Sequence, residues 1–390
     1  MDFEEAVALA GGGVTAHDLE QRLTPAGVFA LTDAWELMGA AMSTAVEQES
    51  LGPLGWVYCV ITRSTSVQCR TRRLDDGNVV ILIPLGILAR TRVLARRLLW
   101  HLADEETPTI RYLASTLDVR TFPWELAPGL IPVFGEDATA QDDAYWEALA
   151  AFDARTAPDE AQDTIANDVM CYSFVNLGLH ELVHITARHD QLLKLARAQD
   201  PRIPPHFDLT TLRRGMEVCA DSVAAHNFVS LHMRHEMMAG FVTEHPDVFF
   251  GRSSFAMAML FGLYDTHRKT VYEYDDGIYP HPIIRYELFY EEILQAVHNS
   301  QPPLAERAQQ YSKDGWRDCM DAFDRLEWDC LRGEYGSPRF WVKGGTGRYL
   351  PVTTLKYGAA SVLQSRLLAD QSLAAETHRL AIEIFRPEPE

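Results

Sequence analysis

The sequence predicts a mainly helical α+β protein with a small antiparallel sheet ahead of its central helix. Apolar residues recur with helical spacing over residues 15–50 and 85–104, and a long apolar run begins at Ile165. Segments 56–61, 67–74 and 78–83 have the composition of strands, and Asp76-Gly77 is a strong two-residue hairpin signal. A chain of 390 residues with 47% hydrophobic content can bury a large core. We therefore expect either one large domain with additional segments or two closely packed domains.

Composition along the chain divides it into three regions. Residues 1–160 form an N-terminal α+β region, in which the proline-punctuated, acidic stretch 107–158 is a candidate lid. Residues 161–300 contain the motifs that can carry chemistry. Residues 301–390 form a helical extension, with a helix around 316–328 and another over 358–385; the glycines at 344–347 lack the Lys-Ser/Thr ending of a phosphate loop and predict a turn.

The net charge of −20 excludes a general binder of nucleic acids or anionic membranes, since both require a cationic surface. Eight arginines nevertheless gather between Arg63 and Arg97, against only Asp75 and Asp76. We interpret them as a solvated face of a sheet and a helix rather than a docking patch for an acidic partner. Six scattered cysteines without CxxC pairs, no secretory signal and no run of 18 apolar residues predict a reduced, cytoplasmic protein.

The candidate metal centre begins with His180-Glu181-Leu182-Val183-His184, near the end of the apolar run. Residues four apart lie on one face of a helix, so the imidazoles of His180 and His184 can bind one Zn²⁺. Glu181 is rotated by about 100° from His180, which places its carboxylate near a water molecule on the open side of the metal. The arrangement is that of a metallopeptidase general base.

Two segments compete to supply the third ligand. Glu217 and Asp221 share a face of a second helix among small and apolar residues, so Glu217 can complete a two-His, one-carboxylate zinc site while Asp221 accepts the free N–H of a liganding histidine. The alternative, Asp190, requires a sharp turn at Ala187, which is unfavourable without glycine. If the first helix continues, His189 lies about 180° from His180 and takes a supporting or surface role.

His-Glu-x-x-His at 180–184 followed by Glu-x-x-Ala-Asp at 217–221 resembles the gluzincin metallopeptidases, and among them the bacterial phage-exclusion Lit-type peptidases and related soluble gluzincins. The resemblance covers roughly residues 160–295. His281-Pro282-x-x-Arg285 is similar to a weaker element of several such families. It offers His281 either as a catalytic hydrogen-bond donor or as a structural residue, and Arg285 as a residue that supports the ligands.

This resemblance implies a zincin-like catalytic core over 161–300, with one Zn²⁺ per chain. An edge strand in such a core offers backbone hydrogen bonds to an extended peptide, and we expect 78–84 or 56–62 to be that strand. The implied activity is hydrolysis of peptide bonds in a narrow set of proteins, in a defence or regulatory setting with a candidate regulatory protein partner. The alternative is a catalytically silent zincin fold that serves as a binding or sensor module, against which the presence of Glu181 argues.

Overall fold

The computed structural model describes residues 1–15, 19, 25–48, 55–64, 68–101, 160–263, 278–280, 282–331, 342–343, 349–350 and 360–385. The candidate lid at 107–158 and the glycine segment 344–347 lie outside these residues. Described helices and strands are α1 (Phe3–Leu9), α3 (Pro25–Gln48), β1 (Val57–Thr62), β2 (Arg70–Arg73), β3 (Val79–Pro84), α4 (Leu85–His101), α6 (Glu160–Thr186), α7 (His189–Arg197), α8 (Leu209–Arg234), α9 (Glu236–Glu244), α10 (Pro246–Leu263), α11 (Pro282–Ser300), α12 (Pro302–Leu331), β4 (Val342–Lys343), β5 (Tyr349–Leu350) and α14 (Ala360–Phe385).

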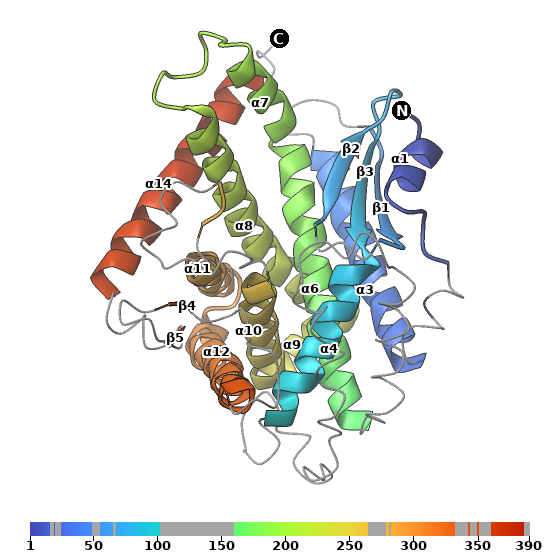
Figure 1. The fold of residues 1–390 in the computed structure, drawn as a ribbon, viewed down its shortest axis with the longest axis vertical. Coiled ribbons are helices and arrows are strands. Elements are labelled where there is room, and N and C mark those ends of the chain that lie inside the picture. Colours follow the sequence, from blue (N-terminus) through green and yellow to red (C-terminus); the bar gives the residue numbers. More distant parts are fainter. Residues whose placement is uncertain are drawn as a thin grey trace.

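The helix α6 is the centre of the fold (Figure 1). The sheet, α3 and α4 lie on one side of it, and α8, α11 and α14 lie on the other. Its sequence is apolar nearly all round, and Val169, Phe174 and Val175 are at most 1% exposed. A helix with no polar face is stable only when neighbours cover every side, which explains why the motif helix is central.

The three-stranded sheet is mixed, so the prediction of an antiparallel sheet is wrong in part. The hairpin prediction is confirmed: Gly77 adopts φ +86° and β2 pairs antiparallel with β3. The strand β1, however, pairs parallel with β3, and the strand order is β1-β3-β2. Strands β1 and β2 are neighbours in sequence but occupy opposite edges, an arrangement that depends on the path of their connection rather than on strand composition.

The arginine-rich segment is not one solvated face, as the sequence had suggested. Arg90, Arg92 and Arg96 on α4 are 1–3% exposed. The Arg92 guanidinium forms an ion pair with Asp163 of α6, and its Nε donates to Asn167 Oδ1 at 3.0 Å. Burial of a charge is costly unless it is paired and hydrogen-bonded, so this network ties α4 to the motif helix. Arginines of β2, in contrast, stay exposed.

One hydrophobic cluster extends from the sheet and α3 through α6 to α10, α11 and α12. Its members come from all three regions defined by composition, and the boundaries of those regions stay a prediction. Among the described helices, none combines the length and the apolar character that crossing a membrane requires.

The helices α10 and α12 cross where two glycines meet. A Cβ atom built on Gly315 would lie 2.0 Å from the backbone oxygen of Gly251, whereas one built on Gly178 would meet the flexible end of Met38 at 2.6 Å. We expect Gly315→Ala to lower the free energy of unfolding by about 3 kcal/mol, because the backbone of α10 must shift. Gly178→Ala is the matched control and should cost less, since Met38 can change rotamer. Urea denaturation measures both; equal losses would contradict the backbone clash.

Candidate metal centre

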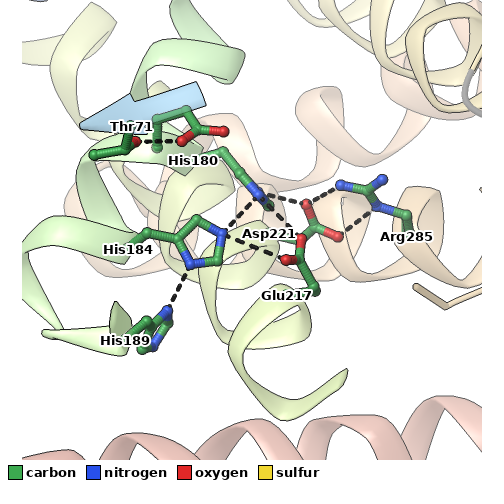
Figure 2. Close-up of polar contacts among 8 residues, drawn as sticks. Thr71, His180, His184, His189, Glu217, Asp221 and Arg285 are labelled. Carbon is green, nitrogen blue, oxygen red and sulfur yellow. Dashed lines mark hydrogen bonds and ion pairs between the residues drawn. The ribbon is translucent and has the colours of Figure 1, made fainter. Parts of the chain in front are cut away.

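The two motif histidines project from one face of α6 near its C-terminal end. Their Nε2 atoms are 3.1 Å apart, and both rings are largely buried. Figure 2 shows the rings turned toward each other and toward the carboxylate of Glu217. The four-residue spacing therefore has the predicted result: both imidazoles point toward one position.

Glu217 comes from α8, which packs alongside α6. Its Oε2 lies 3.4 Å from His180 Nε2 and its Oε1 lies 3.8 Å from His184 Nε2. Ligands at about 2.0–2.1 Å from a tetrahedral Zn²⁺ are separated from each other by about 3.3 Å. The observed separations of 3.1, 3.4 and 3.8 Å therefore fit a shared metal ion. Among the described residues, these three form a group whose ligand atoms lie within 4.8 Å of one another.

Asp221 orients His180 through Nδ1, the ring nitrogen that does not face the other two candidate ligands. His180 Nδ1 lies 2.9 Å from Asp221 Oδ1, and Arg285 of α11 donates through Nε and a terminal nitrogen to both Asp221 oxygens at 2.6 Å. Burial raises the pKa of Asp221, but Arg285 and His180 outweigh it and hold that pKa at about 2. The ionised carboxylate accepts Nδ1–H and leaves the Nε2 lone pair of His180 for the centre, which is how carboxylates fix metal-binding histidines.

His189 orients the second motif histidine. The helix α6 ends before Arg188, which adopts a left-handed conformation at φ 53°, and α7 then begins at His189. This break turns the buried His189 ring so that its Nδ1 lies 2.8 Å from His184 Nδ1. Burial lowers the pKa of His189 well below the usual range, so its neutral Nδ1 can accept the N–H of His184. His189 therefore contacts a motif histidine, which a continuous helix would not have allowed.

The centre requires a positive charge. With both Nδ1 atoms protonated, two Nε2 lone pairs and one carboxylate face each other, an arrangement that is repulsive unless a cation or a proton joins them. The pKa of His180 reflects this: burial lowers it, but the hydrogen bonds to Asp221 and Glu217 prevail and raise it to about 10. Burial raises the pKa of Glu217, but the hydrogen bond to His180 and the positive charges of His184, His180 and Arg285 prevail and hold it below its ordinary value. The donor set thus suits a metal cation.

Asp190 does not join this group. Its side chain is 43% exposed, and its carboxylate lies 3.4 Å from the Lys194 amine and 3.9 Å from Arg73 Nε. The left-handed turn falls on Arg188 rather than on Ala187, and it brings His189 instead of Asp190 toward the centre. The geometry therefore favours Glu217 as the carboxylate ligand.

A cleft of about 450 Å³ opens beside the centre and is lined by β2, α6, α7, α8 and Tyr279. Glu181 lies in its wall and accepts a hydrogen bond from the Thr71 hydroxyl of β2. The strand beside the site is therefore β2. The expectation that 78–84 is an edge strand is wrong, because β3 has partners on both sides. The alternative, 56–62, is an edge strand, β1, but none of its residues lines the cleft. The outer edge of β2 has no strand partner among the described residues.

Tyr279 also lines the cleft and is 54% exposed. The negative charge of Glu217 and partial burial raise the pKa of its phenol, which therefore stays protonated as a hydrogen-bond donor. His281, the predicted donor, lies outside the described residues. Sequence reasoning gave no role to Thr71 or Tyr279; the only signal for Tyr279 was its position two residues before His281.

Comparison of the chain with protein-family models, with curated proteins and with solved structures finds no match. The interpretation of this centre therefore rests on its own geometry.

Proposed function

We propose that this protein is a zinc-dependent endopeptidase of gluzincin type, with one Zn²⁺ held by His180, His184 and Glu217. The observation that carries the proposal is the convergence of these three donors, at separations suited to a tetrahedral ion, in a cleft that also contains Glu181. Two histidines and one carboxylate leave a fourth position open, which distinguishes catalytic zinc sites from structural ones.

The chain supplies the groups that peptide hydrolysis needs around this ion. A bound Zn²⁺ would polarise the scissile carbonyl and lower the pKa of a water molecule. Glu181, which is not a ligand, takes the proton from that water and transfers it to the leaving amine. The hydroxyl of Thr71 holds the Glu181 carboxylate against the strand β2, where an extended peptide can pair with the strand edge. A binding module does not need a general base, so the presence of Glu181 in an open cleft favours an enzyme over a catalytically silent binding module.

The test combines metal analysis with identification of cut sites. Purified full-length protein is loaded with zinc or treated with a chelator, then incubated with a bacterial lysate and, separately, with unfolded casein. We expect about one zinc per chain and a few discrete new N-termini in the lysate that depend on zinc. Intact casein would support a narrow target in a defence or regulatory setting. Rapid casein degradation would reject the narrow target but would leave the metallopeptidase function in place. Absence of zinc uptake would reject the metallopeptidase.

His189 provides a test of the metal centre that does not need a substrate. We expect His189→Leu to weaken zinc binding by about 10–100-fold, because His184 then loses the acceptor that fixes its tautomer. His189→Gln is the matched variant: its side-chain oxygen can accept the same N–H, so affinity should fall less. Competition with a chromophoric chelator measures both constants. Equal affinities in wild type and His189→Leu would contradict the assigned contact.

Tyr279 is the candidate donor to the oxyanion that forms during hydrolysis. Tyr279→Phe removes only the hydroxyl, and we expect kcat to fall by about 10²–10³-fold with zinc content unchanged, as for other donors of this kind. Cleavage of whichever lysate target is identified provides the assay. A variant that loses substrate affinity while kcat is preserved would assign Tyr279 to binding instead.

A further inference from the structure

Four arginines line the cleft of a protein whose net charge is −20. Three belong to β2, whose sequence is Arg70-Thr71-Arg72-Arg73, and the fourth is Arg213 of α8. In an acidic chain, a concentration of cations beside the centre sets this cleft apart from the average surface. The charges meet there only because the sheet packs near α6 while α8 packs on its other side.

Among the described residues, the carboxylates of the same cleft leave most of these cations without an ion-pair partner. Glu217 and Glu181 are the ligand and the base of the proposed centre, and a divalent cation balances them. Asp190 lies 3.9 Å from Arg73, with both side chains at least one-third exposed, and such a pair contributes little. No ion pair joins Arg213 to a carboxylate of the described part of the chain. Its neighbour Arg214, in contrast, is bound by Asp370 of α14 at 2.7 and 2.8 Å.

Two of the arginines lie a few residues away, on the same helix or strand, from a residue of the site. Arg213 precedes Glu217 by four residues, so the two lie on one face of α8 with their Cβ atoms about 5–6 Å apart. Arg73 follows Thr71 by two residues on β2, so it shares the face of Thr71 about 6.7 Å further along the strand. Thr71 bonds to Glu181, and Arg73 and Arg213 line the same cleft from β2 and α8, the elements that carry Thr71 and Glu217.

We propose that Arg73 and Arg213 form a subsite for a carboxylate of the peptide substrate, within a residue or two of the scissile bond. The proposal rests on the endopeptidase function and adds its substrate class. Arginine forms two parallel hydrogen bonds with a carboxylate, and such charge-assisted bonds are stronger than neutral ones. Arg70 and Arg72 lie on the opposite face of β2, and their charges add to the positive potential around this strand. Because an endopeptidase cuts inside the chain, the carboxylate is that of an Asp or Glu side chain; a C-terminal carboxylate this close to the scissile bond would instead indicate an exopeptidase.

Matched peptide hydroxamates can measure this preference without a known substrate. The first carries Glu beside the hydroxamate and an amidated C-terminus, the second carries Gln instead, and the third keeps Gln but has a free C-terminal carboxylate. Isothermal titration calorimetry gives their dissociation constants with the zinc-loaded full-length protein at low salt. We expect about a 10-fold tighter Kd for the first probe than for the second. Whichever probe binds more tightly identifies the source of the carboxylate.

The variants assign the preference to the two arginines. Arg73→Gln and Arg213→Gln, combined, should reduce the Glu-to-Gln ratio to about one, while Arg307→Gln on α12, the same change outside the cleft lining, should leave it unchanged. Zinc content must stay the same in all three proteins. Equal affinity of wild type for the three probes would overturn the subsite.

A second readout separates this proposal from the proposed function. Arginine Nε–H resonances of the metal-free protein should shift on addition of acetylated, amidated peptides that contain Glu, but not on addition of the Gln counterparts. If zinc does not bind and hydroxamates fail, these shifts still support a carboxylate subsite. If the hydroxamates bind but neither readout distinguishes the Glu compounds from their Gln counterparts, the subsite is rejected and the zinc centre is still supported.

Discussion

Glu181→Gln should lower the rate of peptide hydrolysis by about 10²–10⁴-fold while zinc content stays near one per chain. The amide cannot take a proton, and general acid–base catalysis by a positioned carboxylate contributes an effect of this size. Glutamine has the same length as glutamate, and its oxygen can still accept the hydrogen bond from Thr71. The loss therefore reports chemistry rather than misplacement. The measurement pairs cleavage rates with metal analysis of the same samples.

Glu181→Asp is the control for position. It keeps a carboxylate but withdraws it by one methylene from both Thr71 and the centre, so its rate should fall between those of wild type and Glu181→Gln. Loss of zinc from Glu181→Gln would mean that Glu181 is a ligand and that the assigned roles are wrong. An unchanged rate in Glu181→Gln would remove it from the mechanism altogether.

Glu217→Ala should weaken zinc binding on the order of 10³-fold, because the apparent zinc affinity of about 10–16 kcal/mol in small zinc sites is shared among only a few ligands. The substitution removes the only carboxylate of the group formed with His180 and His184. Zinc affinity is measured by competition with chelators of known strength, at one pH because the ligands must be deprotonated.

Asp190→Ala is the matched control for the third ligand. Asp190 lies on α7 in exposed ion pairs, so its loss should leave zinc affinity within about 2-fold of wild type. The reverse outcome, a large effect from Asp190 and a small one from Glu217, would move the metal to the end of α6 and contradict the geometry described here. Thermal unfolding of the metal-free variants serves to exclude a folding defect.

Periodicity in the sequence predicted which side chains of the helical motifs share a face. A four-residue spacing places two imidazoles on one face whatever else the helix contacts, and so His180 and His184 could be paired in advance. The same rule placed Glu217 and Asp221 on one face, and their apolar neighbours predicted that this face is buried. The hairpin at Asp76-Gly77 was likewise local, since the turn requires positive φ where glycine stands.

Tertiary structure decided everything that depends on how separate elements pack. The order β1-β3-β2, which brings Thr71 rather than β3 to Glu181, follows from the path of a connection and not from strand composition. The role of His189 depends on a helix break at Arg188, a residue with no intrinsic preference for positive φ. Arg73 and Arg213 line one cleft although they are 140 positions apart in sequence. Periodicity specifies which side chains share a face, whereas only long-range packing specifies which faces meet.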